Sequence, residues 1–176
     1  IVIPASVGLI VLDKEIIRLL FERGAFDSRA TLLTAGALRY YSLGLFATAS
    51  SPVIARTFYS FQDTVTPVVV SFLSVGLNIC LNAILVRVMS HLGLALATSI
   101  SGIFSFSLLL FLLRKKLGTI GGKRLILDFS KISLASLLMG GGLLFLKNSL
   151  LNFSFKLEFI RLFFLILIGI LIYGIV

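Results

Sequence analysis

The chain has 176 residues, of which 59% are hydrophobic and 13% are charged, and its formal net charge is +9. A soluble domain carries about 25% charged residues, so this chain has roughly half of the charge that a water-facing surface needs. The composition therefore excludes a soluble enzyme and a disordered chain, and it indicates an integral membrane protein.

Six apolar stretches, separated by short polar breaks, follow one another along the chain. They cover residues 1–12, 30–61, 67–89, 92–113, 126–146 and 159–176. Segments inside a bilayer must satisfy their backbone hydrogen bonds internally, and the alternating pattern of a barrel is missing, so we expect helices. We expect the first and last stretches to be helices cut by the chain ends, with four complete spans between them. The expected fold is an all-α bundle of about six transmembrane segments.

Polar residues at the ends of these stretches predict helix boundaries. Residues 13–15 interrupt the first apolar run, and a short amphipathic stretch at 16–21 follows. Asp27 or Ser28 can cap the second helix by accepting a backbone N–H of its first turn. For the third helix, we expect Thr66 as the cap and Pro67 at the first helical position, where its missing N–H costs nothing.

Basic residues cluster between the fourth and fifth stretches. The cluster consists of Arg114, Lys115, Lys116, Lys123, Arg124 and Lys131. By the positive-inside rule we place this loop in the cytoplasm. Most basic residues lie at the ends of apolar runs, near lipid head groups, so we expect membrane lipids and no nucleic acid as partners. The chain then divides into residues 1–116, a basic cytoplasmic loop at 117–125, and two further helices at 126–176.

Polar side chains follow one face of the third stretch, because Ser71, Ser74, Asn78 and Asn82 are spaced three or four residues apart. Structural hydrogen bonding is the first explanation of the two amides, and contact with a ligand or ion is the alternative. Hard cations prefer oxygen ligands. We therefore name a candidate sodium site formed by Asn78, Asn82, Thr98 and a backbone carbonyl near Leu94. It has no carboxylate of its own.

The sequence offers little for catalysis. Its single histidine, His91, has no neighbour that could complete a nucleophilic set, and its seven acidic residues fall at helix ends or in loops. The spacing patterns of metal sites and nucleotide-binding loops do not occur. We therefore expect no enzyme activity and no cofactor other than the candidate cation.

Three motifs carry a family likeness: LLFERGAFD at 19–27, ARTFYSFQDTVTPV at 55–68 and GLALATSIS at 93–101. In this order and spacing they resemble the MurJ/MviN family of lipid II flippases, within the multidrug/oligosaccharidyl-lipid/polysaccharide exporter superfamily. The second motif is the most specific. The resemblance implies fourteen transmembrane helices, of which this chain would supply the ninth to the fourteenth.

The resemblance also implies a function: transport of the undecaprenyl-linked peptidoglycan precursor across the bacterial inner membrane, by alternating access. The arginines that line the family's central cavity and would contact the head group lie in preceding helices of the same chain. Those helices are therefore expected partners of the part described by this sequence. A gate or hinge loop is expected from Arg56, Tyr59, Gln62, Asp63, Thr64, Thr66 and Pro67; a tight helix connection is the alternative reading. A groove for the lipid tail is expected in 126–176, with Gly140, Gly141, Gly142 and Gly169.

Other functions remain compatible with these residues, because a fold does not fix a substrate. One alternative is a polysaccharide-unit flippase or a cation-coupled multidrug exporter of the same superfamily. Another is a membrane scaffold that transports nothing.

Overall fold

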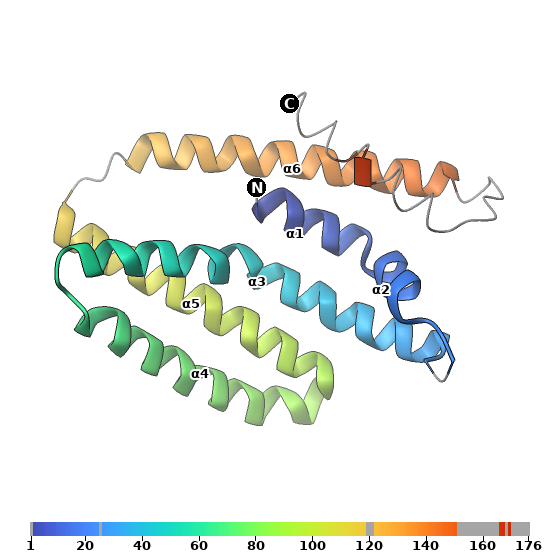
Figure 1. Cartoon of the computed structure of the whole chain (residues 1–176), viewed down its shortest axis with the longest axis horizontal. Coiled ribbons are helices and arrows are strands. Elements are labelled where there is room, and N and C mark those ends of the chain that lie inside the picture. The colour runs from blue at the N-terminus through green and yellow to red at the C-terminus, as the bar shows by residue number, and fades with distance from the viewer. Residues whose placement is uncertain (1, 25, 119–121, 151–165, 168, 170–176) are drawn as a thin grey trace. The chain divides into compact units, whose positions relative to one another are not determined.

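A computed structural model describes residues 2–24, 26–118, 122–150, 166, 167 and 169 (Figure 1). These residues form six main helices: α1 (Val2–Val11), α2 (Asp13–Phe21), α3 (Ser28–Ser60), α4 (Val65–Met89), α5 (His91–Leu117) and α6 (Gly122–Leu150). No strand occurs within these ranges, and the predicted all-α fold is confirmed.

The six helices differ from the six predicted segments in three ways. First, α2 is a separate helix that begins one residue after Leu12, because Asp13 and Glu15 place negative charge in its first turn, where the helix dipole favours it. Second, the segment predicted at 159–176 lies outside the described residues, apart from three helical positions at 166, 167 and 169. Third, α6 begins at Gly122, inside the stretch expected as the loop 117–125.

Two helices, α4 and α5, are long and apolar enough to cross a membrane. They have 25 and 27 residues, with mean hydropathy of 2.2 and 2.1 over their most apolar windows. In contrast, α1 and the stretch 129–145 of α6 are apolar but shorter than a full span. Large apolar side chains on α4 are exposed, among them Phe72 and Val88. Such exposure is typical of a helix whose surface faces lipid or further helices.

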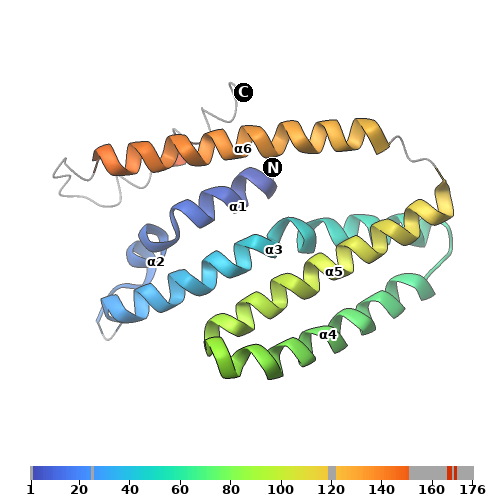
Figure 2. The same ribbon diagram turned by 180° about the vertical axis from the view of Figure 1, so that it is seen from behind.

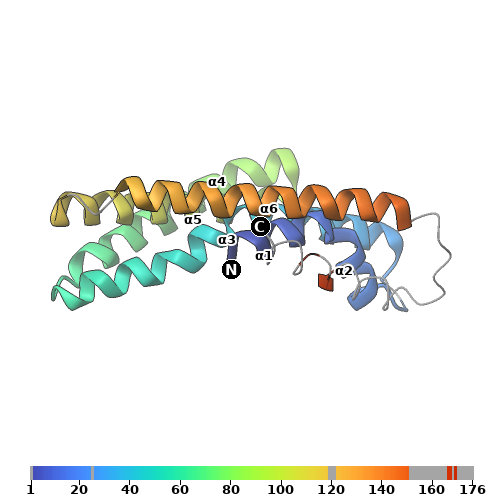
Figure 3. The same cartoon turned by 90° about the horizontal axis from the view of Figure 1, so that it is seen from above.

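The chain divides into two compact units, one of residues 1–39 with 123–176 and the other of residues 40–122. The first unit has a core of Leu12, Met139 and Leu143, against which half-buried side chains of α1 and α2 pack. The axis of α2 turns away from that of α1 directly after Leu12 (Figures 1 and 3). This turn lets the amphipathic α2 bury Ile17 while Leu20 stays exposed.

A buried ion pair joins α2 to α3 in the first unit. Asp13 is 1% exposed, and one oxygen of its carboxylate accepts a hydrogen bond from Arg39 Nε at 2.8 Å and lies 2.7 Å from Nη2 of the same guanidinium. The other oxygen accepts the backbone N–H of Lys14 at 2.8 Å. Two donors from one guanidinium fix the direction of the contact as well as its charge.

The predicted caps of α3 and α4 have different outcomes. Asp27 caps α3 as expected, because its carboxylate accepts the N–H of Ala30 at 2.9 Å. The prediction of Thr66 as the cap of α4 is wrong. The helix starts at Val65, and Asp63 accepts the N–H of Thr66 at 3.0 Å.

In the second unit, α4 and α5 form an antiparallel hairpin (Figures 1 and 2). They are joined by Ser90 alone, which adopts a left-handed φ of 51°. Position 93 requires glycine, because a Cβ there would collide with the carbonyl group of Leu85. The hairpin therefore places the polar face of α4 beside the first turns of α5.

Candidate functional site

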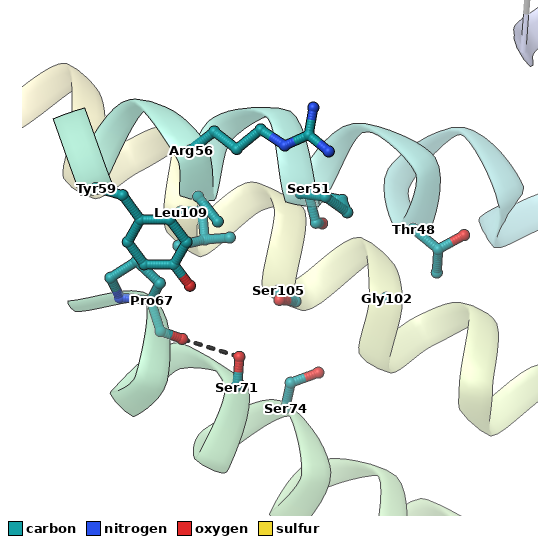
Figure 4. Close-up of a pocket in the computed structure, with 12 residues that line it drawn as sticks. Thr48, Ser51, Arg56, Tyr59, Pro67, Ser71, Ser74, Gly102, Ser105 and Leu109 are labelled. Carbon is teal, nitrogen blue, oxygen red and sulfur yellow. Dashed lines mark hydrogen bonds between the residues drawn. The ribbon is translucent and has the colours of Figure 1, made fainter. Parts of the chain in front are cut away.

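A pocket of about 480 Å³ lies between α3, α4 and α5 of the second unit (Figure 4). Its lining residues are Thr48, Ser51, Pro52, Ala55, Arg56, Tyr59, Pro67, Ser71, Ser74, Gly102, Ser105 and Leu109. The lining combines hydroxyl groups, one phenol and one guanidinium with small apolar side chains. The pocket therefore brings a few polar groups together on a lining that is mostly apolar.

Helices α3 and α5 pack closely near Thr48. A Cβ on Gly44 would lie 2.6 Å from Ser99 Cα, and a Cβ on Gly102 would lie 2.5 Å from Thr48 Cγ2. The hydroxyl of Ser99 donates to the carbonyl of Tyr40. Small residues allow α3 and α5 to approach this closely, as they do in many transmembrane helix pairs.

An apolar cluster lies beside the pocket at Leu109. Phe58 of α3 is 1% exposed and packs with Val70 of α4 and with Leu109 and Leu113 of α5. Between Thr48 and Phe58, α3 contains Pro52, which has no N–H to donate to the carbonyl four residues earlier. The interruption at Pro52 gives a physical reason why α3 leaves space beside α5.

Most hydroxyl groups of the pocket already donate to backbone carbonyls. Ser51 donates to Ala47 at 2.8 Å, and Ser74 of α4 donates across to Ser101 of α5 at 2.9 Å. Ser71 donates to the carbonyl of Pro67 at 2.9 Å (Figure 4). Since each hydroxyl has one proton, these groups can offer only their lone pairs to a ligand.

Arg56 and Tyr59, both expected in the gate loop, belong to the last turns of α3 and line this pocket. Figure 4 shows the side chain of Arg56 extended along α3 and the ring of Tyr59 near Pro67 and Leu109. Within the described residues, Arg56 has neither an ion pair nor a hydrogen bond through its side chain. The sequence placed Arg56 and Tyr59 together in the gate loop. In the structure both belong to α3, and the connection to α4 begins only after Ser60.

The connection between α3 and α4 is a Schellman turn. The N–H of Asp63 donates to the carbonyl of Phe58 at 3.1 Å, and that of Gln62 donates to Tyr59 at 2.9 Å. Gln62 occupies the left-handed position, with φ of 58°, which glycine usually fills. Thr64 precedes α4 without a cap bond from its side chain.

Asp63 connects this turn to the end of α5. Its carboxylate accepts Thr66 Oγ1 at 2.9 Å and Lys116 Nζ at 2.6 Å. The hydrogen bond from Lys116, followed by that from the Thr66 N–H, lowers the pKa of Asp63 from 3.8 to about 2. Lys116 Nζ also lies 5.8 Å and 5.9 Å from the ring centres of Phe58 and Phe61. From the sequence, Lys116 was only one member of a basic cluster.

The candidate sodium site consists of two pairs, each within one helix. Asn82 Nδ2 donates to Asn78 Oδ1 at 2.9 Å, and the hydroxyl of Thr98 donates to the carbonyl of Leu94 at 3.0 Å. The remaining oxygen of Asn82 is buried and has no hydrogen-bond partner within the described residues. A buried oxygen without a donor is an available ligand for a cation.

A second pocket, of about 520 Å³ and lined almost entirely by apolar groups, lies in the first unit. It is lined by Pro4, Ala5, Gly8, Leu9, Leu12, Ile16, Met139, Leu143, Ile166 and Gly169. Of the four glycines expected in a lipid-tail groove, only Gly169 lines it. Gly140 instead packs on Val7, whose Cγ1 would lie 2.7 Å from a Cβ there, and Gly141 borders open space. Gly142 is half-buried.

Long apolar helices, close contacts through small residues and buried hydroxyl groups define a polytopic α-helical membrane protein. The family model described as lipid II flippase MurJ matches residues 1–165. The chain belongs to this family.

Three similar proteins illustrate the relationship. The lipid II flippase MurJ of Thermosipho africanus is 40% identical over 137 residues, which cover 78% of this chain and 27% of the relative. The probable lipid II flippase MurJ of Thermotoga maritima is 34% identical over 171 residues, covering 97% of this chain and 33% of the relative. A solved structure of lipid II flippase MurJ in an inward closed conformation matches with a TM-score of 0.82 and 38% identity. That match covers 99% of this chain and 34% of the solved one. The chain thus spans about a third or less of the length of these proteins.

Proposed function

We propose that the protein containing this chain is a lipid II flippase, which moves the undecaprenyl-linked peptidoglycan precursor across the bacterial inner membrane. The observation that carries this proposal is the agreement in fold with a MurJ structure over 99% of the chain at 38% identity. Such a protein moves its substrate from one leaflet of the bilayer to the other and breaks no covalent bond. We therefore infer a transporter rather than an enzyme. The partners are the lipid-linked precursor, membrane lipids and the helices that complete the family's fold.

The two pockets support an amphiphilic substrate. A lipid-linked sugar needs a polar surface for its head group and an apolar surface for its tail while it crosses the bilayer. The pocket between α3, α4 and α5 offers hydroxyl oxygens with Arg56 and Tyr59 at one end. The pocket around Leu12 and Leu143 offers an apolar lining. We assign head-group contacts to the first and the polyprenyl tail to the second, since apolar clefts accommodate apolar chains.

A monovalent cation is part of the proposal. Asn82 Oδ1 is buried without a partner, and Thr98 Oγ1 keeps its lone pairs after donating to Leu94. We propose that these oxygens bind sodium. A cation that binds one conformation more tightly than another shifts the population of the transporter toward that conformation.

Genetic complementation tests the proposal. The complete encoded protein should restore growth and shape to a bacterial strain depleted of its own lipid II flippase, while a version lacking residues 40–122 should not. Membrane fractions should contain both proteins at similar amounts. Failure of the complete protein to rescue, despite normal levels in the membrane, would contradict the assignment.

A further inference from the structure

The side chain of Asp63 and its backbone N–H connect the ends of three helices. The N–H closes the turn after α3, the carboxylate caps the first turn of α4 through Thr66, and Lys116 of α5 donates to the same carboxylate. We propose that this corner is a rigid clamp, which stays closed while the transporter changes conformation. The proposal rests on the proposed function, because it concerns the movement that transport requires.

An apolar cluster lies directly beside the polar contacts. Phe58 is 1% exposed, packs with Val70, Leu109 and Leu113, and also lies under the ammonium group of Lys116. The same three helices are therefore joined by buried apolar contacts and by hydrogen bonds. Segments that open at low free energy have few buried apolar contacts and exposed backbone hydrogen bonds. The corner differs from such segments in its buried apolar contacts, although residues 59–62 of the turn itself are exposed.

The backbone at Gln62 leads to the same conclusion. A non-glycine residue in the left-handed region is strained, so it persists only where the surroundings determine its conformation. Here, two backbone hydrogen bonds of the turn enclose Gln62. A hinge that swung freely about residues 59–67 would break these bonds together with the contact to Lys116. We therefore place the moving joints of the protein outside this corner.

A covalent link between the two charged groups tests the clamp. A water-soluble carbodiimide condenses the Asp63 carboxylate with the Lys116 amine into an amide, and the carbodiimide takes up the released water to become a urea. The 2.6 Å separation suits this zero-length reaction. The matched control is Lys116→Arg, which keeps a positive charge but cannot form the amide. Both complete proteins are reconstituted into vesicles, treated, and assayed for lipid II flipping relative to untreated samples.

We expect peptide mass spectrometry to detect the link in the unsubstituted protein, and both treated proteins to retain the same fraction of their untreated activity. Absence of the link would contradict the geometry. A loss of activity at least fivefold greater in the linked protein than in Lys116→Arg would show that the corner must open, and would overturn the proposal.

A second measurement does not depend on transport. Asp63→Asn and Lys116→Gln should each lower the melting temperature, and the double variant should lower it no further than the more harmful single change. Additive losses would refute the clamp. If the untreated complete protein flips no lipid II, the proposed function fails, and this thermal comparison alone decides whether the clamp exists.

Discussion

At the scale of single residues, two carboxylates make the most specific polar contacts. Asp13 pairs with Arg39, 26 residues away, and Asp63 pairs with Lys116, 53 residues away. The sequence placed Asp63 in the expected gate loop and named Thr66 as the cap of α4, although capping depends only on residues two or three positions away. It could not predict either basic partner, since no spacing rule links residues so far apart and only the packing of helices brings them together.

The buried ion pair gives the first prediction. Removing the guanidinium in Arg39→Met leaves the carboxylate of Asp13, which is 1% exposed, without its counter-charge. We expect the free energy of unfolding to fall by about 2–3 kcal/mol. This is near the lower end of the range for a broken buried pair, because the side chain of Arg39 is half exposed. Thermal melting in detergent measures the change. The double variant Asp13→Asn/Arg39→Met should recover part of the loss, and a single variant as stable as the unsubstituted protein would contradict the role of the pair.

The depressed pKa of Asp63 gives a pH-dependent prediction. The folded pKa, about 2, is below the usual value of 3.8, so the ionised carboxylate stabilises the folded state. This contribution is fully present above pH 3.8 and is lost as the pH falls through 2. Asp63→Asn should therefore lower the melting temperature by a few degrees at pH 6 and by nearly nothing at pH 2. A difference between the two proteins that is independent of pH would argue against the contact with Lys116.

At the scale of helices, apolar length and polar breaks predicted α3, α4 and α5 to within two residues at most ends. Boundaries were missed where acidic side chains determine the start of a helix. Asp63 caps α4 from two residues before its start, and the acidic residues at 13 and 15 allow α2 to begin immediately after α1. The glycines of α6 were expected to form a groove. Gly140 instead packs on Val7, a contact that the sequence of α6 alone cannot reveal.

The close approach of α3 and α5 gives a prediction with an internal control. In Gly44→Ala the new Cβ would lie 2.6 Å from Ser99 Cα, so the helices must separate. We expect the free energy of unfolding to fall by about 1–3 kcal/mol, as it does at other sites where a side chain is added to a well-packed interior. Gly76→Ala on α4 meets nothing within 4 Å and should be neutral or slightly stabilising. Equal stabilities of the two variants in thermal melting would contradict the packing of α3 on α5.

The proposed cation site makes a prediction for the α4–α5 hairpin. Sodium at ten times its dissociation constant should stabilise the unsubstituted protein by about 1.4 kcal/mol relative to choline at equal ionic strength. Asn82→Ala removes the buried unpartnered oxygen and should abolish this difference. Ser71→Ala, which removes a hydroxyl bound to its own helix, should keep it. Equal protection by sodium in the unsubstituted protein and in Asn82→Ala would rule out the site.

At the scale of the whole molecule, composition alone predicted a membrane protein, and the family followed from three motifs. The pockets were less accessible to sequence reasoning, because each is lined by segments that are distant in the chain. Tyr59 and Pro67 were singled out as part of a loop, yet Ser105 of α5 faces the same cavity. Similarly, Met139 of α6 meets Gly8 of α1 in the apolar pocket. Such contacts depend on how helices pack, which hydropathy does not encode.

Lipid II flipping by the complete encoded protein in reconstituted vesicles tests the central claim most directly. We expect the protein to expose lipid II at the opposite leaflet at a rate well above that of empty vesicles. Gly8→Leu, which has space at its Cβ but fills the apolar pocket, should reduce this rate at least fivefold, whereas Gly76→Leu should not. A correctly folded protein that moves lipid II no faster than empty vesicles would contradict the assignment as a flippase.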